Sequence, residues 1–438
     1  MSDRQDTIAA VATAPGRGGV AVVRVSGPDA WLVAEAVTGR KIAEEDAGRF
    51  FRARFGAVDD GLMLVFKAPR SYTGEDAVEF QGHGGMVAPR RVLEACFAAG
   101  ARLARRGEFT ERAFLNGRLD LSAAEAVIDL VDARTDRAAD DALARLAGAL
   151  TRPYEQLYAD LIDLSSRLEH ALDFDEGELP ESFHGQITVD MAADKGKIDS
   201  LISTAREGRL LREGALVVLA GAPNAGKSSL MNALLGEDRA IVSNAAGTTR
   251  DSIEESLIVD GWAIRLTDTA GLRTTTDAIE AEGVVRSEAL IARADLVLAL
   301  DCDIPGMDAS KILHLHAKCD LPLSGDGALA VSLKDGESSL AVSSVTGEGL
   351  EELKRVIASR LSAQAAKAVE APIADVTTRQ CEHLERAAAA LACAQKAPDC
   401  VVAAGEVRKA ASEIGKIVGR EYSEDLLDAL FSRFCVGK

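Results

Sequence analysis

The sequence predicts a multidomain protein of mixed α+β and α/β class, in which an α/β domain is inserted into a discontinuous helical domain. Three observations lead to this fold class. The 438 residues exceed the size of one ordinary core. Residues 214–361 alternate apolar strand-like runs with helical segments, which is typical of a mainly parallel sheet covered by helices. The segments on either side, 119–213 and 362–438, show helical periodicity instead.

Residues 1–118 are expected to form an α+β domain. Short β-like runs occupy 7–13, 20–26, 62–67 and 77–81, and a helical pattern over 87–99 ends at Gly100. With 47% hydrophobic residues, the chain can bury several separate cores of this kind.

An arginine-rich segment ends this first domain. Its members are Arg90, Arg91, Arg102, Arg105, Arg106, Arg112 and Arg118, opposed nearby by Glu94, Glu108 and Glu111. Two interpretations remain open: a solvated face with internal ion pairs, or a surface that contacts an anion or RNA. The net charge of −19 argues against nucleic-acid binding through the overall field, so any RNA contact would have to be local.

The two helical segments are expected to pack together as one domain. Leu157, Leu161, Leu164 and Leu168 recur at helical spacing and predict one apolar stripe. Pro153 is expected to kink this helix or separate it from the alanine-rich helix before it.

A phosphate-binding loop is predicted at the first strand of the inserted domain. The run Leu216–Ala220 is followed by Gly221-x-x-x-x-Gly226-Lys227-Ser228, the Walker A spacing. Glycines let backbone N–H groups turn toward an anion, and the next helix presents its positive end. Lys227 would reach the outer phosphates, and Ser228 would bind Mg²⁺. Gly236 is expected to close that helix.

Further motifs follow in the order that a GTPase requires. Thr249 is the candidate switch hydroxyl for Mg²⁺, Asp268 ends a strand where it can hold Mg²⁺ through water, and Asp320 can accept two N–H donors of guanine. An Asp-Gly hairpin is expected at 259–262. The predicted GTP- or GDP-binding residues are Asn224, Ala225, Gly226, Lys227, Ser228, Ser229, Ser243, Thr248, Thr249, Asp268, Thr269, Ala270, Gly271, Lys318, Asp320, Ser343 and Ser344.

Two departures from the usual GTPase pattern have consequences. The base-recognition loop begins with Ala317 where asparagine is usual, so we expect nucleotide affinity to be weaker by about 1–2 kcal/mol, with guanine preference retained through Asp320. Leu272 stands where Ras-like proteins carry a glutamine that orients the attacking water, so hydrolysis must take its positive charge and water-positioning group from elsewhere.

The chain resembles the MnmE (TrmE) family of tRNA-modification GTPases over nearly its whole length. The resemblance rests on the motifs Ala14-Pro15-Gly16-Arg17-Gly18-Gly19, Ser71-Tyr72-Thr73-Gly74-Glu75-Asp76, Gln81-Gly82-His83-Gly84-Gly85, the run Arg106 to Asn116, and the ending Phe434-Cys435-Val436-Gly437-Lys438. It implies an N-terminal folate-binding and dimerisation domain (1–118), two helical halves (119–213 and 362–438) and an inserted Ras-like P-loop G domain (214–361).

The resemblance also implies chemistry and partners. Together with the flavoprotein MnmG, in a heterotetramer, such homodimeric proteins add an aminomethyl or carboxymethylaminomethyl group to carbon five of tRNA wobble uridine U34. The one-carbon unit would come from formyl- or methylene-tetrahydrofolate. By motif, the folate contacts would be Arg24, Glu79, Arg118 and Lys438. Arg118 stands where lysine is usual, which keeps the charge but not the geometry.

In this family, a potassium ion between two G domains takes the place of an arginine finger. The matching K⁺ positions are Asn224, Ser243, Ala245 and Thr248, and Glu280 matches the glutamate that positions water. Glu280, Lys227 and Cys435 are therefore the catalytic candidates. Glu280 could instead be a surface carboxylate at a helix start. Cys435 could be a nucleophile or a merely positional cysteine.

The cysteine pattern and hydropathy predict a cytoplasmic protein without a membrane segment. The seven cysteines form no Cys-x-x-Cys pair, which fits a reducing compartment. There is no run of 18 apolar residues, and the N-terminus does not look like a signal peptide.

Two other functions compete with the tRNA-modifying GTPase. The first is a GTP-gated switch, such as a ribosome-assembly factor, whose only chemistry is its own hydrolysis. The second is a folate-dependent one-carbon enzyme whose nucleotide site has decayed, as Ala317 suggests. The terminal motifs argue against the first, and Lys227, Ser228, Asp268 and Asp320 argue against the second.

Overall fold

The N-terminal sheet is built from antiparallel strands with one parallel strand at its edge. A computed structural model describes residues 6–173, 182–238, 254–268, 287–320, 339–365 and 374–438. The strands are β1 (Ile8–Val11), β2 (Val20–Ser26), β3 (Phe50–Phe55), β4 (Asp59–Phe66), β5 (Ala77–His83) and β6 (Arg102–Leu103), in the order β3-β4-β5-β2-β1-β6. Only the pair β1 and β6 is parallel among these strands. The four predicted strands are confirmed; β3 and β6 were not predicted.

Two helices, α1 (Ala30–Thr38) and α2 (Ala88–Ala98), cover this sheet. Their buried residues, such as Val33 and Cys96, pack in one cluster with Val25 and Phe80 of the strands. A short 3-10 turn, η2 (Glu44–Asp46), lies between α1 and β3. The helix predicted over 87–99 is confirmed, whereas α1 was not predicted.

Contacts within the chain divide the protein into two compact units. Unit 1 comprises 1–128, 145–173 and 399–438, and unit 2 comprises 129–144 and 174–398. Beyond the sheet, unit 1 contains α3 (Glu108–Leu115), most of α4 (Leu121–Asp132), α6 (Thr151–His170), η3 (Ala171–Asp173), α13 (Cys400–Val418) and α14 (Glu424–Phe431). Unit 2 contains most of α5 (Asp136–Leu146), α7 (Ser182–Ser203), α8 (Ala205–Glu213), α12 (Thr378–Ala394) and the inserted α/β domain.

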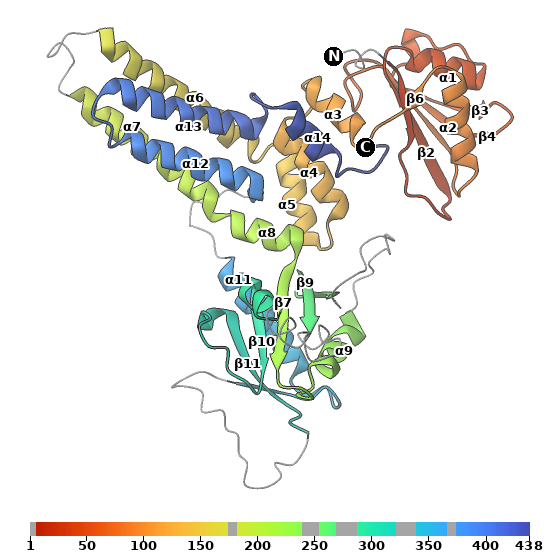
Figure 1. Cartoon of the computed structure of the whole chain (residues 1–438). Helices are drawn as coiled ribbons and strands as arrows, with labels where there is room; N and C mark the ends of the chain where they lie inside the picture. Colours follow the sequence, from red (N-terminus) through yellow and green to blue (C-terminus); the bar gives the residue numbers. More distant parts are fainter. Residues whose placement is uncertain (1–5, 174–181, 239–253, 269–286, 321–338, 366–373) are drawn as a thin grey trace, which may run out of the picture. The chain divides into compact units, whose positions relative to one another are not determined.

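Two pairs of neighbouring helices each join a helix of the first predicted helical segment to a helix of the second. Helix α13 runs alongside α6, and α12 runs alongside α7 (Figure 1). The four leucines of the predicted stripe on α6 are all buried, as their spacing predicts. Pro153 does not separate two helices, because the break between α5 and α6 falls before it. Pro153 lies in the first turn of α6, where a backbone N–H would have no acceptor within the helix, so its missing N–H costs no helical hydrogen bond.

The inserted domain has a mainly parallel sheet, as the alternation of strands and helices predicts. Its strands are β7 (Ala215–Gly221), β8 (Glu254–Val259), β9 (Trp262–Asp268), β10 (Leu296–Leu300), β11 (Ile312–Ala317) and β12 (Leu340–Val342), in the order β12-β11-β10-β7-β9-β8. Among these described strands, β8 alone is antiparallel to its neighbour, β9. Residues 215–220 are all buried because β7 lies inside the sheet with both faces covered.

Local sequence explains two further features of this domain. Asp260 and Gly261 adopt positive φ values of 46° and 80°, as a two-residue hairpin of the predicted Asp-Gly type requires. Helix α9 (Lys227–Asp238) buries Leu230 and Leu234 against the sheet and continues past Gly236, so the expected end at that glycine is wrong. The structure also describes α11 (Leu350–Gln364) and the 3-10 turn η5 (Ala309–Lys311) in this domain.

Helix α5 contacts the β8–β9 hairpin within unit 2. The guanidinium of Arg137 lies over the Trp262 ring, 4.2 Å from its centroid, and donates to Glu207 of α8 over 2.8 Å. Trp262 is buried, so this cation–π contact ties the hairpin to α5 and α8.

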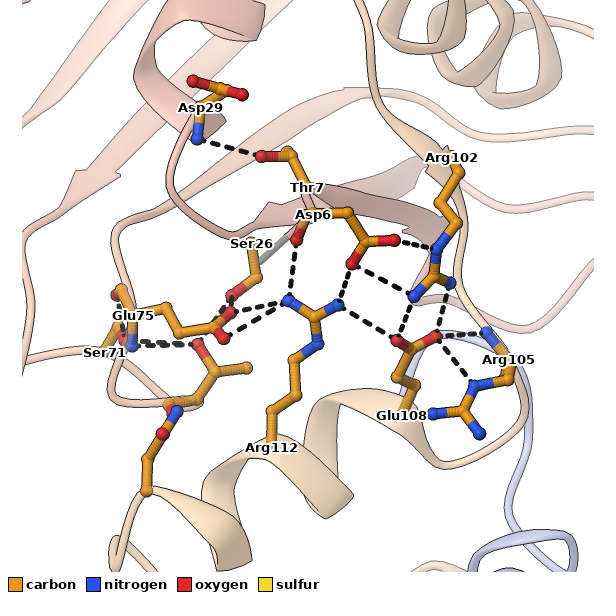
Figure 2. A network of polar contacts seen from close by, with 12 residues as sticks. Asp6, Thr7, Ser26, Asp29, Ser71, Glu75, Arg102, Arg105, Glu108 and Arg112 are labelled. Carbon is orange, nitrogen blue, oxygen red and sulfur yellow. Dashed lines mark hydrogen bonds and ion pairs between the residues drawn. The ribbon is translucent and has the colours of Figure 1, made fainter. Parts of the chain in front are cut away.

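Four of the seven arginines in the predicted basic patch form ion pairs within the chain, and Figure 2 shows three of them, Arg102, Arg105 and Arg112. Arg112 is buried and donates to Asp6 over 2.8 Å, to Glu75 over 3.2 Å and to Glu108 over 3.0 Å. Arg102 bonds Asp6 and Glu108, and the Arg105 backbone N–H donates to Glu108 over 2.8 Å. Of the two open interpretations, internal pairing therefore holds for these arginines and for Arg90, which pairs with Glu94.

This network fixes the charge state of Glu108. Burial alone would raise the pKa of this carboxyl, but hydrogen bonds from Arg102, the Arg105 N–H and Arg112 outweigh burial and lower the pKa to about 2. Because the folded pKa lies below the ordinary value of 4.5, the ionised carboxylate stabilises the fold above pH 4.5, and this contribution is lost as pH falls from 4.5 toward 2.

We therefore expect Glu108→Gln to lower the free energy of unfolding of unit 1 by roughly 3 kcal/mol at pH 7, with a smaller difference from wild type at pH 4. Hydrogen exchange of α3 peptides across a urea series in the full chain would measure it. Glu94→Gln, which breaks the exposed pair with Arg90, is the control and should change little. A Glu108→Gln difference that is absent at pH 7, or grows at pH 4, would contradict this account.

Candidate nucleotide-binding site

The predicted phosphate loop joins the end of β7 to the start of α9. Gly221 and Gly226 have φ values of 154° and 105°, and Asn224 lies in the left-handed region at 62°. A Cβ on Gly221 would come within 2.8 Å of the Leu300 carbonyl oxygen on β10, so the close packing of the loop against this strand requires glycine. The loop turns directly into α9, whose N-terminal end carries partial positive charge.

Lys227 is folded across this loop. Its ammonium donates to the carbonyl oxygens of Gly221 and Ala222, both over 2.9 Å, and the residue is 5% exposed. A nearly buried ammonium whose acceptors, in the described part of the chain, are neutral carbonyl oxygens can gain from an anion, because charge-assisted hydrogen bonds are the stronger kind. The geometry suits a lysine whose N–H groups would donate to phosphate oxygens in place of these carbonyl oxygens.

A hydroxyl and a carboxylate meet beside the loop. Ser228 Oγ donates to Asp268 Oδ2 over 2.7 Å. They meet because β7 and β9 are parallel neighbours, with Leu219 paired to Asp268, so the carboxyl end of each strand reaches the same edge. A cavity of about 420 Å³ opens here, lined also by Met231, Asn232 and Glu255. Hydroxyl and carboxylate oxygens are ligands that suit Mg²⁺, so this pair fits such an ion.

The predicted base-recognition residues lie at the ends of β11 and β12. Lys318, at φ 59°, reaches back and donates to the Asn224 carbonyl oxygen over 2.8 Å, which links this loop to the phosphate loop. Ser343 is fully buried; its Oγ accepts from the N–H groups of Val345 and Thr346 and donates to Asp320 Oδ1 over 2.6 Å. Asp320 is thereby oriented and retains lone pairs that can accept from a guanine base.

All of the GTP-binding candidates that the structure describes lie at one edge of the sheet. They come from the loop between β7 and α9 and from the ends of β9, β11 and β12: Asn224, Ala225, Gly226, Lys227, Ser228, Ser229, Asp268, Lys318, Asp320, Ser343 and Ser344. The other candidates lie outside the described residues and stay predictions: Ser243, Ala245, Thr248, Thr249, Thr269, Ala270, Gly271 and Glu280.

The predicted folate residues all belong to unit 1. Arg24 on β2 and Glu79 on β5 face each other in register and are joined over 2.8 Å. The Arg24 guanidinium lies 5.1 Å from the Tyr72 ring centroid and 5.6 Å from that of Phe109. Sequence reasoning did not single out these two aromatic residues, although both fall inside the motifs that carry the family resemblance.

The C-terminal residues are held against this N-terminal sheet. The Cys435 carbonyl oxygen accepts from Gly107 N–H over 3.4 Å, and Val436 forms an isolated bridge with Arg106. A Cβ on Gly437 would lie 2.4 Å from the Val11 carbonyl oxygen, so only glycine fits there. Cys435 itself is exposed. Arg118 is exposed too, and its side chain lies close to Gly74.

Comparisons with known proteins agree with this arrangement. A family profile described as GTP-binding protein TrmE N-terminus matches residues 7–118, and one described as MnmE helical domain matches 121–435. A tRNA modification GTPase MnmE of Stutzerimonas stutzeri is 39% identical over all of both chains. One of Chromobacterium violaceum is 40% identical over 99% of this chain and 98% of its own, and one of Neisseria meningitidis is 40% identical over all of both.

Among solved structures, the G domain of the T. maritima FeoB iron transporter is 30% identical over 33% of this chain and 98% of its own, with a TM-score of 0.23. No helix among the described residues is long and apolar enough to cross a membrane.

The inserted parallel sheet, its phosphate loop and the motifs at its strand ends define a P-loop GTPase with additional α+β and helical parts. The chain belongs to the MnmE family of tRNA modification GTPases, because relatives about 40% identical match it from end to end. The predicted fold class and family are thus confirmed, while the exact domain boundaries stay a prediction.

Proposed function

We propose that this chain binds and hydrolyses GTP at the edge of its parallel sheet and uses the cycle in tRNA modification. The observation that carries the proposal is the convergence of three contacts there: Lys227 folded across the phosphate loop, Ser228 on Asp268, and Ser343 on Asp320. A phosphate cradle, a pair of oxygens suited to Mg²⁺ and an oriented carboxylate for guanine are the parts that a GTP site needs.

Each of these residues has one task in the proposed site. Lys227 and the α9 N-terminus neutralise phosphate charge. Ser228, with Thr249 from the switch segment, would hold Mg²⁺, and Asp268 would bind it through water. The ion would supply positive charge that offsets the charge developing on the phosphate during hydrolysis. Asp320 would accept from the two N–H groups on the guanine edge.

Potassium belongs to the same proposal. Leu272 cannot orient a water molecule, so we assign that task to Glu280. We also propose that a K⁺ ion supplies the positive charge that an arginine finger would otherwise provide. The residues that would hold this ion are Asn224, Ser243, Ala245 and Thr248. Asn224 supports this in one respect: it lies in the phosphate loop in a left-handed conformation, with its carbonyl fixed by Lys318. In this proposal two G domains of a homodimer share the ion.

We expect GTP turnover to be at least about tenfold faster in K⁺ than in Na⁺ at equal ionic strength, because a missing transition-state charge contact costs more than 1.4 kcal/mol. Glu280→Ala should lower kcat about tenfold or more while leaving GDP affinity within about twofold. Steady-state phosphate release and fluorescent-nucleotide binding measure both. Equal turnover rates in K⁺ and Na⁺ would contradict the potassium mechanism. Equal losses of kcat and of GDP affinity in Glu280→Ala would contradict the proposed role of Glu280.

The modification half of the proposal places a formyl- or methylene-tetrahydrofolate in unit 1. Arg24, Glu79, Arg118 and Lys438 are its proposed contacts. The Arg24 guanidinium between Tyr72 and Phe109 fits a ligand with a planar ring and carboxylates, because aromatic faces stack and guanidinium pairs with carboxylate. When bound, this cofactor would supply the one-carbon unit added to carbon five of U34, with MnmG as the partner in the cytoplasm.

A tRNA nucleoside profile tests this half. We expect a strain lacking the gene to lose the C5-modified wobble uridine and to recover it on expression of the wild-type chain. Expression of Cys435→Ser separates the two readings of that exposed thiol: a nucleophile predicts loss of modification with GTPase activity intact, and a positional cysteine predicts recovery. An unchanged profile in the deletion strain would overturn the modification function and favour a GTP-gated switch.

A further inference from the structure

The base-recognition loop must be held in place although its first residue is an alanine. The loop leaves β11 at Ala317, and Lys318 immediately adopts a left-handed conformation with φ 59°. L residues other than asparagine, aspartate and histidine seldom occupy this region, so a neighbouring group has to support the turn. The methyl group of Ala317 cannot form hydrogen bonds that would do so.

Support at this point comes from Asp301, the residue that directly follows β10. Its Oδ2 accepts from the backbone N–H of Ala317 over 3.3 Å, and its Oδ1 lies 2.8 Å from His316 Nδ1. An ionised carboxylate can only accept, so Nδ1 of His316 carries the hydrogen in this contact. The carboxylate therefore holds two consecutive residues at the end of β11.

Asp301 is itself fixed in place. Its N–H donates to the Leu315 carbonyl oxygen over 3.0 Å, which extends the parallel pairing of β10 with β11 by one residue. Its own backbone lies at φ 49°, in the left-handed region that aspartate tolerates better than most L residues. This conformation turns the chain out of β10 at the place where the side chain reaches Ala317.

We propose that Asp301 is a positioning residue for guanine recognition, and that it takes over the loop-holding task of the side chain missing at 317. The proposal rests on the proposed guanine-nucleotide function. The loop is then held at three points, namely Ala317 by Asp301, Lys318 by Asn224 and Asp320 by Ser343. Loss of the contact between Asp301 and Ala317 would let the turn at Lys318 shift, and Asp320 would then move away from the edge of the base.

Partial exposure limits the size of the effect. The side chains of Asp301 and His316 are 39% and 46% exposed, so water competes for their hydrogen bonds. We expect a loss of GDP affinity of about three- to tenfold in Asp301→Ala, which is the range for a partly solvated bond to a charged group.

The test compares GDP and IDP binding to the full chain with Mg²⁺, by displacement of a fluorescent nucleotide. Hypoxanthine lacks the exocyclic amine of guanine, so Asp320 makes one hydrogen bond fewer to IDP. Asp301→Ala should therefore weaken GDP more than IDP and reduce the preference for GDP. Asp303→Ala is the control, because it removes a carboxylate charge only two residues from Asp301. The Asp303 side chain is exposed and accepts from the Ile304 N–H, so this variant should leave the preference for GDP over IDP unchanged.

Repeating the Asp301→Ala substitution in an Ala317→Asn variant separates a positioning role of Asp301 from a general loss of stability of the domain. In Ala317→Asn, the new amide can hold the loop itself, so adding Asp301→Ala should cost less than about twofold in GDP affinity. Equal losses in both backgrounds with an unchanged GDP-to-IDP ratio would overturn the proposal. Failure of the wild-type chain to bind GDP would instead overturn the proposed function, and this inference with it.

Discussion

Parallel pairing of β7 with β9 and β10 is the constraint on which the nucleotide site depends. This register sets Leu219 opposite Asp268 and Gly221 opposite Leu300, so that strand ends far apart in sequence meet at one edge. A side chain at Gly221 would collide with the backbone of β10, which makes the phosphate loop part of the sheet packing. Binding residues and core residues in this domain therefore cannot be varied independently.

A second constraint organises the N-terminal part of the chain. Arg112 and Glu108 of α3 are buried and pair with each other, and Arg112 also pairs with the half-buried carboxylates of Asp6 and Glu75. The carboxyl-terminal residues cross the same region beside Gly107. Buried ion pairs add little net stability, but removing one partner leaves the remaining charges unpaired and shielded from water, which is destabilising. The network consequently fixes where α3, the 71–75 loop and the chain terminus meet, close to Arg24 and the aromatic rings around it.

Local signals in the sequence predict much of this architecture. The apolar run of β7, the Asp260–Gly261 turn and the leucine stripe of α6 depend on nearest neighbours and periodicity, and the structure agrees with all three. Strand β3 was missed because it is an edge strand in which Phe50, Arg52 and Arg54 remain exposed, so it lacks a continuous apolar run. The partners of Arg112 and the support of Ala317 by Asp301 could not be predicted, since each joins residues that only the tertiary fold brings together.

The central claim is that Asp320 makes this edge of the sheet a guanine site. Competition of GTP and ATP against a bound fluorescent guanine nucleotide, with Mg²⁺ present, tests it most directly. The account predicts displacement by GTP and at least about a hundredfold weaker displacement by ATP, because adenine offers no N–H pair to a carboxylate held by Ser343. Equal competition by ATP would contradict it and remove Asp320 from the site.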